Sequence, residues 1–400
     1  MTVYQNDYKA HILRLDNEFE IKRELANIKV DKKAFDILTQ KMSYLHIKIE
    51  KVDTRAANLI KQYLSAIGGE AAISQEAYTY TERTTDMIIS ASKKNIFLLI
   101  KKIQEDKYGL PEIAKEIEKN LFSSVGAIKL GNNILDFNKS TYIMGTINFF
   151  KSSSLEPANE KTVLKKVENF VKAGANIIDI CDECFYKENS IHKDANELLP
   201  KVVSIIKQIK AQFPGVILSI DTVKINVAKE CLNAGIDIIN NSIPLKYNEE
   251  LINLIAKTKC PLIMIFNPTL ITNQPKPLIS ISDVIREIQS NVSYALGKGV
   301  GKDKIIIDPG IGFGRSDRDN FLILKQLSSF KYFNMPILVG LSRRSFLGEA
   351  LKGKMESYRL SALAANTMAI INGANIVRTH SSEEALTMRN VIESIKKTEE

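Results

Sequence analysis

Two cysteines separated by two residues, Cys181 and Cys184, have the spacing of a metal-binding or redox pair. A structural zinc site needs two further ligands. Cys231 falls in an expected helix and Cys260 at the opposite end of an expected strand, so neither is well placed to complete a site. His192 could approach, but one histidine leaves the site incomplete. Zinc or redox chemistry is therefore the less favoured interpretation of this pair.

A second set of chemically capable residues follows short apolar runs in the later part of the chain. They are Asn148, Asp179, Asp221, Asn240, Asp308, Ser342, Arg343, Arg344, Arg378 and His380. Acids and amides suit a heterocycle with adjacent N–H donors and carbonyl acceptors, because a carboxylate accepts two parallel hydrogen bonds. Arg378, His380 and Arg343 suit an oxyanion such as phosphate. A site with both halves would bind a flat polar ring joined to a phosphate group.

The apolar runs have the length and composition of strands that are buried on both faces. They are YIMGTIN (142–148), NIIDIC (176–181), VILSID (216–221), DIINN (237–241), PLIMIF (261–266), KIIIDP (304–309), PILVGL (336–341) and NIVRTH (375–380). Amphipathic helical patterns separate the runs, and several end at a glycine before the next run, as at Gly174, Gly235 and Gly373.

Eight strands that alternate with helices predict an α/β fold, the (β/α)8 TIM barrel. The carboxyl ends of its strands meet at one mouth, where we expect the polar residues to converge. A single aspartate such as Asp221 is often only a helix cap, but here polar residues recur at nearly every strand end. An open doubly wound sheet is the alternative. It normally carries a glycine-rich loop after its first strand, where this chain has FFKSSS.

The residues before the barrel predict two smaller features. AIKLGNNILDF (127–137) predicts a hairpin around Gly131-Asn132-Asn133 that closes the bottom of the barrel. We therefore divide the chain into an N-terminal α/β module (1–122) of unknown role and a barrel (127–398).

The N-terminal module shows no catalytic constellation, so we expect a packing or assembly role. Strand-like runs occur at KAHILRL (9–15) and YLHIKIEKV (44–52), and Pro111 is placed to begin a helix. In TRAANLIKQYLSAIGG, one helical face carries Ala56, Leu59, Ile60, Tyr63, Leu64 and Ile67.

The composition is that of an ordinary globular protein, with 400 residues, 44% hydrophobic and 25% charged. The net charge is +9, but the lysines are spread among glutamates and tryptophan is absent. We therefore expect a solvated surface, with no nucleic-acid partner. No apolar run approaches the roughly eighteen residues of a membrane span, and the first residues lack the apolar core of a secretory signal. Four cysteines fit a reducing cytoplasm.

At the strand ends, the sequence resembles the dihydropteroate synthase family over residues 127–398. The resemblance is carried by IMGTIN (143–148), SIDT (219–222), IIN (238–240), DPGIGFG (308–314), GLSRRSFLG (340–348) and GANIVRTH (373–380). DPGIGFG and SRRS are specific, whereas SIDT alone is weak. Some members of the family also carry an N-terminal module, and AANLIKQ is similar to a stretch of it.

The resemblance implies a transferase of folate biosynthesis that joins 4-aminobenzoate to 7,8-dihydropterin pyrophosphate and releases pyrophosphate, with Mg2+ placed by Asn148. The implied site residues are Asp221, Asn240, Met264, Asp308, Gly340 and Arg344 for the pterin, Asn148, Arg378, Thr379 and His380 for pyrophosphate, Phe313 and Ser345 for 4-aminobenzoate, and Asp179 and Glu183 in support. Arg378 and His380 would be catalytic. Arg344 stands where the family usually has lysine, which is not a neutral exchange. We also expect a homodimer, the commonest closed assembly.

The loops after the first, second and fifth strands depart from the family pattern. After the second strand the family continues DIGGESTRPG, in which Asp179 and Glu183 match. Cys181-Asp182 replace the two glycines, Cys184 replaces the serine, and Phe185-Tyr186 replace threonine and arginine. The family's NVTPDSFSDGG has become Asn-FFKSSSLEP, and MHMQG has become MIFNP. The pterin floor is thus kept while the loops over pyrophosphate and aminobenzoate are rewritten.

Three functions fit this pattern. The first is a working synthase in which Lys151, Lys187 or His192 replaces the positive charge of the arginine that the second loop has lost. The retained Arg378-Thr379-His380 favours this function. The second is a non-catalytic pterin-binding paralogue with a regulatory role, which the loop losses favour. The third is a pterin barrel that presents a methyl-folate to a corrinoid protein, and the intact SRRSFLG and VRTH segments argue against it.

Overall fold

The structure is a computed structural model of the chain. It describes residues 10–13, 15, 17–107, 109–122, 125–131, 133–148, 159–181, 195–267, 278, 280–342, 344–349 and 355–397. The chain divides into two compact units, residues 1–123 and residues 124–398. Within the described ranges, no helix combines the length and the apolar character that crossing a membrane requires.

The second unit is the (β/α)8 barrel that the sequence predicts. Its strands are β6 (Tyr142–Asn148), β7 (Ile177–Cys181), β8 (Ile217–Asp221), β9 (Ile238–Asn241), β10 (Leu262–Ile265), β11 (Ile305–Asp308), β12 (Leu338–Val339) and β13 (Ile376–Thr379). They lie in the order β11-β10-β9-β8-β7-β6-β13-β12. A parallel bridge between Ile307 and Ile337 joins β11 to the chain just before β12 and closes the ring. All eight expected strands are confirmed.

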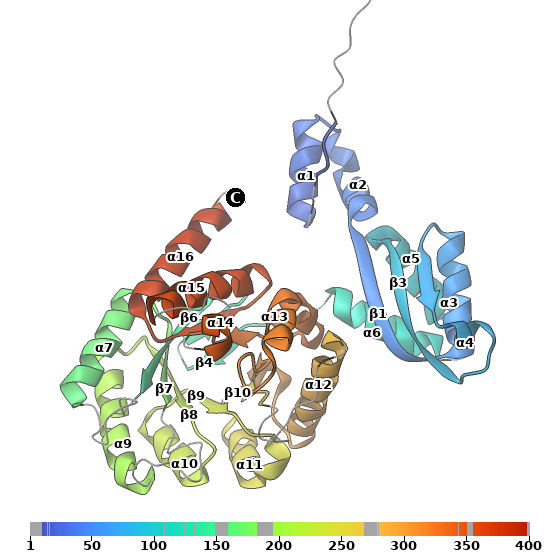
Figure 1. The fold of residues 1–400 in the computed structure, drawn as a ribbon. Helices are drawn as coiled ribbons and strands as arrows, with labels where there is room; N and C mark the ends of the chain where they lie inside the picture. The colour runs from blue at the N-terminus through green and yellow to red at the C-terminus, as the bar shows by residue number, and fades with distance from the viewer. Residues whose placement is uncertain are drawn as a thin grey trace, which may run out of the picture. The chain divides into compact units, whose positions relative to one another are not determined.

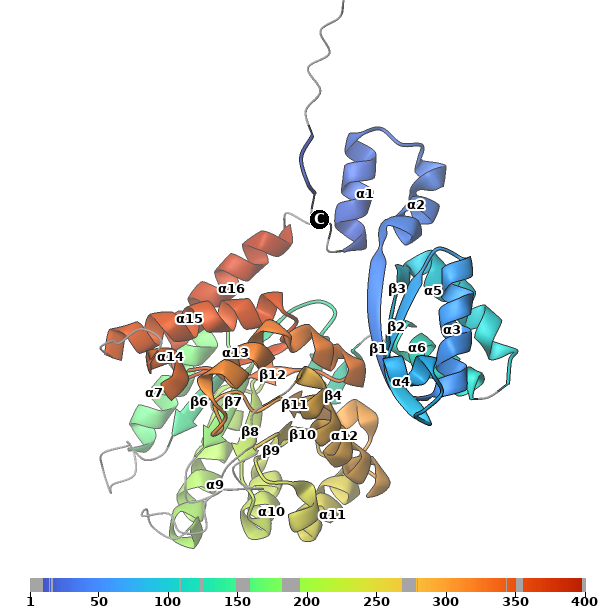
Figure 2. The same ribbon diagram turned by 45° about the vertical axis from the view of Figure 1, so that its right-hand side comes forward.

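Helices follow the strands and surround them (Figure 1 and Figure 2). They are α7 (Glu160–Lys172), α9 (Ala195–Gln212), α10 (Ile225–Ala234), α11 (Glu249–Thr258), α12 (Ile281–Gly297), α13 (Asp317–Lys325), α14 (Ser345–Glu349), α15 (Met355–Ile371) and α16 (Ser382–Lys397). Gly174, Gly235 and Gly373 follow three of these helices with φ of +82°, +112° and +105°. Glycine adopts such angles without a Cβ clash, so the predicted helix ends are confirmed.

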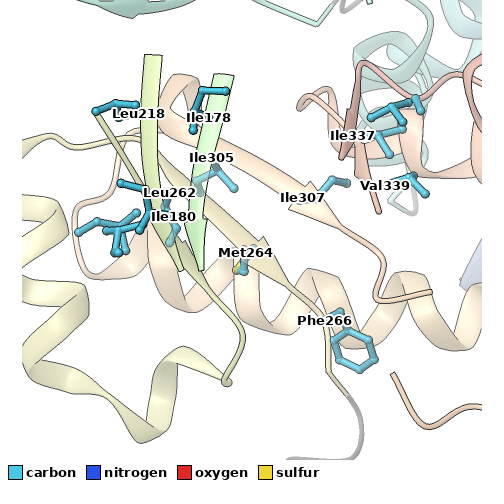
Figure 3. Close-up of a cluster of buried hydrophobic side chains, with 14 of the residues drawn as sticks. Ile178, Ile180, Leu218, Leu262, Met264, Phe266, Ile305, Ile307, Ile337 and Val339 are labelled. Carbon is cyan, nitrogen blue, oxygen red and sulfur yellow. The ribbon is translucent and has the colours of Figure 1, made fainter. Parts of the chain in front are cut away.

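Strand side chains divide the barrel core into two layers, because alternate residues face opposite sides of a sheet. The outer layer, between strands and helices, contains Ile178, Ile180, Leu218, Leu262, Ile305, Ile307 and Val339 (Figure 3). The inner layer contains Tyr142, Met144, Ile177, Ile217, Ile238, Ile263, Ile306, Leu338 and Ile376. These inner residues come from the first halves of their strands, so the lower part of the barrel interior is apolar.

A hairpin closes this lower end, as predicted. Strands β4 (Ile128–Leu130) and β5 (Asn133–Leu135) pair antiparallel. Leu130, Leu135 and Phe137 belong to the same buried cluster as the inner barrel residues, and the Phe137 ring lies edge-on to that of Tyr142 at 5.4 Å. Asn132 of the expected turn lies outside the described residues.

The first unit is a small α/β module with its own core. Its elements are α1 (Glu18–Asn27), α2 (Phe35–Met42), β1 (Tyr44–Asp53), α3 (Thr54–Ala66), β2 (Glu70–Ile73), α4 (Gln75–Tyr78), β3 (Thr84–Ser92), α5 (Lys93–Gln104) and α6 (Leu110–Phe122). The antiparallel sheet has the order β1-β3-β2. The expected apolar face of α3 belongs to the core, and Pro111 lies in the first turn of α6. The strand expected at 9–15 is wrong, since residues 10–13 and 15 are irregular.

Candidate functional site

Four polar residues lie in one row across the carboxyl ends of neighbouring strands. Asn148 of β6 is in register with Cys181 of β7, Cys181 with Asp221 of β8, and Asp221 with Asn240 of β9. Ile217, four residues before Asp221 on the same strand, belongs to the inner layer, so Asp221 also faces inward. The row therefore lines the mouth of the barrel. Asn148, Asp221 and Asn240 are residues that the sequence predicts to converge there, and the structure adds Cys181.

Three buried aspartates surround one buried arginine in this mouth. Asp179, Asp221, Asp308 and Arg378 are 0%, 6%, 3% and 8% exposed. Nη1 of Arg378 lies 3.5 Å from Oδ2 of Asp179, and the hydroxyl of Ser219 donates to Oδ1 of Asp179. All three carboxyls act electrostatically on the guanidinium. When every group is ionised, the three aspartates and the arginine together carry a net charge of about −2.

Burial makes these aspartates weaker acids than usual. It raises the pKa of Asp221 to about 7, with a further contribution from Asp179 and an opposing one from Arg378. Burial also raises the pKa of Asp179 and of Asp308, although Arg378 acts in the opposite direction on both. Burial alone would lower the pKa of Arg378, but the three carboxyls outweigh it and raise that pKa. The arginine therefore stays cationic while the acids can retain protons.

The raised pKa of Asp221 predicts a pH-dependent stability of the ligand-free protein. Its ordinary pKa is 3.8 and its folded pKa is about 7, so the folded state binds more protons between these values. The stabilising contribution is fully present below about pH 4 and is lost as pH rises through about 7, by at most about 1.4 kcal/mol per pH unit. Asp221→Asn should therefore flatten the dependence of the free energy of unfolding on pH, as urea denaturation between these pH values will measure. An unchanged slope in the variant would contradict this.

Two carboxylate oxygens in the mouth have no hydrogen-bond donor among the described residues, namely Oδ1 of Asp221 and Oδ2 of Asp308. The other oxygen of each is engaged. Sγ of Cys181 lies 3.6 Å from Oδ2 of Asp221, and the backbone nitrogen of Gly310 donates to Oδ1 of Asp308 at 2.9 Å. An unsatisfied buried acceptor is unfavourable, so both oxygens are available to the N–H groups of a ligand.

The two glycine-containing segments after β11 and β12 meet through Arg344. Its guanidinium carbon lies 4.1 Å from the centre of the Phe313 ring, its Nε donates to the carbonyl of Gly340 at 3.1 Å, and its Nη1 donates to that of Gly312. A Cβ at Gly340 would lie 2.9 Å from Nε of Arg378. Glycine at this position therefore makes room for the buried arginine.

A cavity of about 400 Å³ adjoins Asn148. Its described lining residues are Thr146 and Asn148 from β6, Lys166, Asn169 and Phe170 from α7, and His380, Ser381, Ser382 and Glu383 around the start of α16. Oγ1 of Thr146 and Oδ1 of Asn148 are buried and have no hydrogen-bond partner among the described residues. The cavity thus combines a lysine and a histidine with unsatisfied neutral oxygens. Sequence reasoning missed Lys166, because nothing in an amphipathic helix marks which of its exposed lysines faces a cavity.

Thr379 contributes to an internal network instead of reaching the mouth through its hydroxyl. It is fully buried and donates to Glu384 at 2.9 Å. Ser342 donates to Oγ1 of Thr379 at 3.1 Å, and the backbone nitrogen of Glu384 donates to Oγ of Ser381. The expected role of Thr379 in binding pyrophosphate stays a prediction. Sequence reasoning missed Glu384. The Ser381-x-x-Glu384 spacing is typical of a helix start and could have indicated that Glu384 lies in the first turn of α16.

Met264 packs on the helix-facing side of β10. It lies in the outer layer with Leu262 and Phe266 (Figure 3), whereas Ile263 and Ile265 face the barrel interior. The expected contact of Met264 with the pterin stays a prediction, and Ile263 and Ile265 are the side chains of β10 on the interior face. In an entirely apolar run the sequence does not reveal which alternate set faces inward.

The remaining expected residues have less structural support. Ser345 begins α14 and is exposed. Glu183 and Arg343 lie outside the described residues, as do Lys151, Lys187 and His192.

Comparisons with known proteins agree on one family. The sequence model of the family described as "Pterin binding enzyme" matches residues 144–380, more than half of the chain. A dihydropteroate synthase of Synechocystis is 30% identical over 279 residues, which cover 67% of this chain and 94% of the relative. The chain belongs to the dihydropteroate synthase family. A second member, from Clostridium beijerinckii, is 31% identical over 257 residues, covering 63% of this chain and 93% of its own length.

Solved structures of the family have the same barrel. The dihydropteroate synthase of Yersinia pestis in complex with a sulfonamide drug matches with a TM-score of 0.61 and 27% identity, covering 68% of this chain and 99% of that one. The Coxiella burnetii enzyme in complex with pteroic acid matches with a TM-score of 0.56 and 27% identity, covering 64% and 93%.

The N-terminal unit also has a counterpart in the family. A probable bifunctional folylpolyglutamate synthase/dihydropteroate synthase of Haloferax volcanii is 27% identical over 360 residues, which cover 85% of this chain and 42% of the relative. The aligned 85% of this chain is longer than residues 124–398, which form the barrel unit, so the similarity extends into residues 1–123.

Proposed function

We propose that this chain is a working dihydropteroate synthase, which joins 4-aminobenzoate to 7,8-dihydropterin pyrophosphate and releases pyrophosphate. The observation that carries the proposal is the meeting of Asp221, Asn240, Asp308 and Arg378 in one barrel mouth, with two carboxylate oxygens that lack donors. The synthases that the chain resembles support the reaction. The rewritten loops favour the alternative, a pterin-binding paralogue without activity.

Asp221, Asn240 and Asp308 would bind the pterin ring. The open oxygens of the two aspartates accept hydrogen bonds from the amino and N–H groups of the ring. Asn240 is fully buried and offers both an acceptor and a donor. Each N–H bond to a carboxylate stabilises its ionised form, which offsets the burial that raises its pKa. Ile265, which pairs with Asp308 in the sheet, is a further candidate to line the pterin pocket, because it faces the barrel interior.

Arg344 and Phe313 would form the boundary between the pterin and 4-aminobenzoate. The guanidinium lies over the Phe313 ring, and hydrogen bonds to Gly340 and Gly312 fix its orientation. It would lie beside the ring carbonyl of the pterin, in the place that the family gives to lysine. Ser345, which is exposed at the start of α14, would lie near the aminobenzoate.

Arg378, His380 and Lys166 would stabilise the leaving pyrophosphate. Negative charge grows on this group as the C–O bond breaks, and cations that are already in place lower the barrier. His380 and Lys166 line the cavity beside Asn148, together with the hydroxyl groups of Ser381 and Ser382 and the carboxyl of Glu383. The lysine supplies a positive charge, and the imidazole and the hydroxyls supply donors for a diphosphate. Lys166 is thus a further candidate for the cation that the second loop lacks.

The donor set at this cavity fits Mg2+. Among the described residues, no three acidic, histidine or cysteine side chains are close enough to hold a metal ion by themselves. Mg2+ commonly takes few protein oxygens together with substrate phosphates, and Oδ1 of Asn148 is such an oxygen. Bound Mg2+ would neutralise part of the charge of the leaving pyrophosphate.

One assay tests the proposal. Purified full-length protein is supplied with dihydropterin pyrophosphate, 4-aminobenzoate and Mg2+, and the formation of dihydropteroate is followed by chromatography. We expect product that depends on both substrates and disappears with EDTA. Pterin binding in calorimetry without product above a heat-killed control would favour the inactive paralogue and reject the synthase.

Replacing Lys166 with methionine should lower kcat by roughly ten-fold, because one preorganised cation near the leaving group is lost. The affinity for a pterin without phosphate should stay the same, since Lys166 lies on α7 beside the cavity, whereas the proposed pterin residues Asp221, Asn240 and Asp308 lie on β8, β9 and β11. Lys161→Met is the matched control, because Lys161 is exposed on the same helix outside the cavity. Equal kcat values for the two variants, measured at saturating substrates, would remove Lys166 from the reaction.

We further propose a cytoplasmic homodimer without a nucleic-acid partner. None of the described cysteines Cys181, Cys231 and Cys260 forms a disulfide, which suits a reducing compartment. Light scattering of the purified protein will measure the assembly, and a monomer at micromolar concentration would contradict it.

A further inference from the structure

Cys181 places a thiol in the mouth where the family pattern has glycine. It ends β7 between Asn148 and Asp221 in the sheet, and its side chain is half-buried. The thiol donates to Oδ2 of Asp221 across 3.6 Å. Among the described residues it is the one hydrogen-bond donor to this carboxyl.

Asp221 indicates that this contact belongs to a ligand site. The residue is 94% buried, since 6% of its surface is exposed, yet its Oδ1 meets no donor among the described residues. Asp179 and Asp308 repel its charge, and Arg378 attracts it. A thiol is a weak donor, so it can fix one oxygen of the carboxyl while the other stays available for a stronger N–H donor.

We propose that Cys181 is a positioning residue that holds Asp221 with Oδ1 directed toward the pterin ring. The proposal rests on the proposed function of this mouth, because it names the pterin as the ligand that Asp221 receives. The thiol acts through Asp221 and not on the reacting carbon. Its loss should therefore weaken pterin recognition and leave the chemical step nearly unchanged.

Substitution at Cys181 separates positioning from general stability. Cys181→Ala should raise the KM for dihydropterin pyrophosphate by about five-fold, the value of one modest hydrogen bond, with kcat and the KM for 4-aminobenzoate nearly unchanged. Cys181→Ser should restore the KM, because a hydroxyl can donate to the same oxygen. Cys231→Ala, which removes a buried thiol of α10, is the control for stability alone. A wild-type KM in Cys181→Ala, or no recovery in Cys181→Ser, would overturn the proposal.

Alkylation tests the position of the thiol without relying on catalysis. Iodoacetamide forms a C–S bond as its C–I bond breaks, iodide leaves, and the thiol proton passes to solvent. Burial raises the pKa of Cys231 and of Cys260 to about 12, so these thiols should stay unmodified. In a Cys184→Ser background, mass spectrometry should locate the label on Cys181 and show protection by a bound pterin.

The two proposals fail in different ways. Alkylated protein should lose most of its affinity for the pterin in calorimetry, because the added group occupies the space beside Asp221. Unchanged affinity after complete labelling of Cys181 would reject the positioning role, whatever the activity. Tight pterin binding that labelling abolishes, in a wild-type protein that forms no dihydropteroate, would reject the synthase and keep the positioning role. A wild-type protein that binds no pterin rejects both.

Discussion

Replacing Asp308 with asparagine should weaken the binding of a dihydropterin by at least about 2 kcal/mol, roughly thirty-fold, because a buried charge-assisted hydrogen bond is lost. Asp308 is 3% exposed, and its Oδ2 meets no donor among the described residues. The backbone bond from Gly310 to Oδ1 can persist in asparagine, so the loop after β11 should keep its shape. The loss is therefore expected in ligand affinity, which calorimetry with a pterin will measure.

The loss of pterin affinity should be specific to an aspartate in the barrel mouth, and a buried aspartate elsewhere provides the control. Asp319→Asn is a suitable control, because Asp319 is also buried but lies in α13, where it accepts from the backbone of Leu278. That variant should alter the free energy of unfolding and leave pterin affinity unchanged. If Asp308→Asn binds the pterin as tightly as the wild type, the proposed pterin pocket is wrong.

Replacing Arg378 with methionine should both destabilise the protein and remove its activity. The guanidinium is the cation closest to Asp179, at 3.5 Å in the described structure, and Asp179 is completely buried. Removing one partner of a buried ion pair commonly costs about 3–5 kcal/mol, because the other charge stays uncompensated. The leaving pyrophosphate would also lose a preorganised cation, so kcat should fall by roughly a hundred-fold or more.

A second substitution separates these two effects. Adding Asp179→Asn to Arg378→Met removes the uncompensated charge, so much of the lost stability should return in urea denaturation. Activity should not return, because no cation replaces the arginine. Recovery of both properties would mean that Arg378 acts only in folding, and recovery of neither would contradict the pairing with Asp179.

The residue types and their order were sufficient to predict the barrel and most of its mouth. Near-continuous apolar runs at regular intervals require strands that are buried on both faces, and eight of them close into a ring. Polar residues at the ends of parallel strands then converge, because all carboxyl ends lie on one side. This is why Asp221, Asn240, Asp308 and Arg378 could be placed together from the sequence.

Tertiary structure alone decided which side chains point into the mouth and which charges balance one another. In β10, a uniformly apolar strand, either set of alternate side chains could face inward. Pairing of Ile263 with Asn240 and of Ile265 with Asp308 turns these two inward and Met264 outward. The packing of helices against strands also brings Glu384 within hydrogen-bond distance of Thr379 and places Lys166 at the cavity. Local sequence determines whether a segment forms a helix or a strand and how its apolar residues are spaced. The direction in which each side chain points depends on contacts with residues far away in the chain.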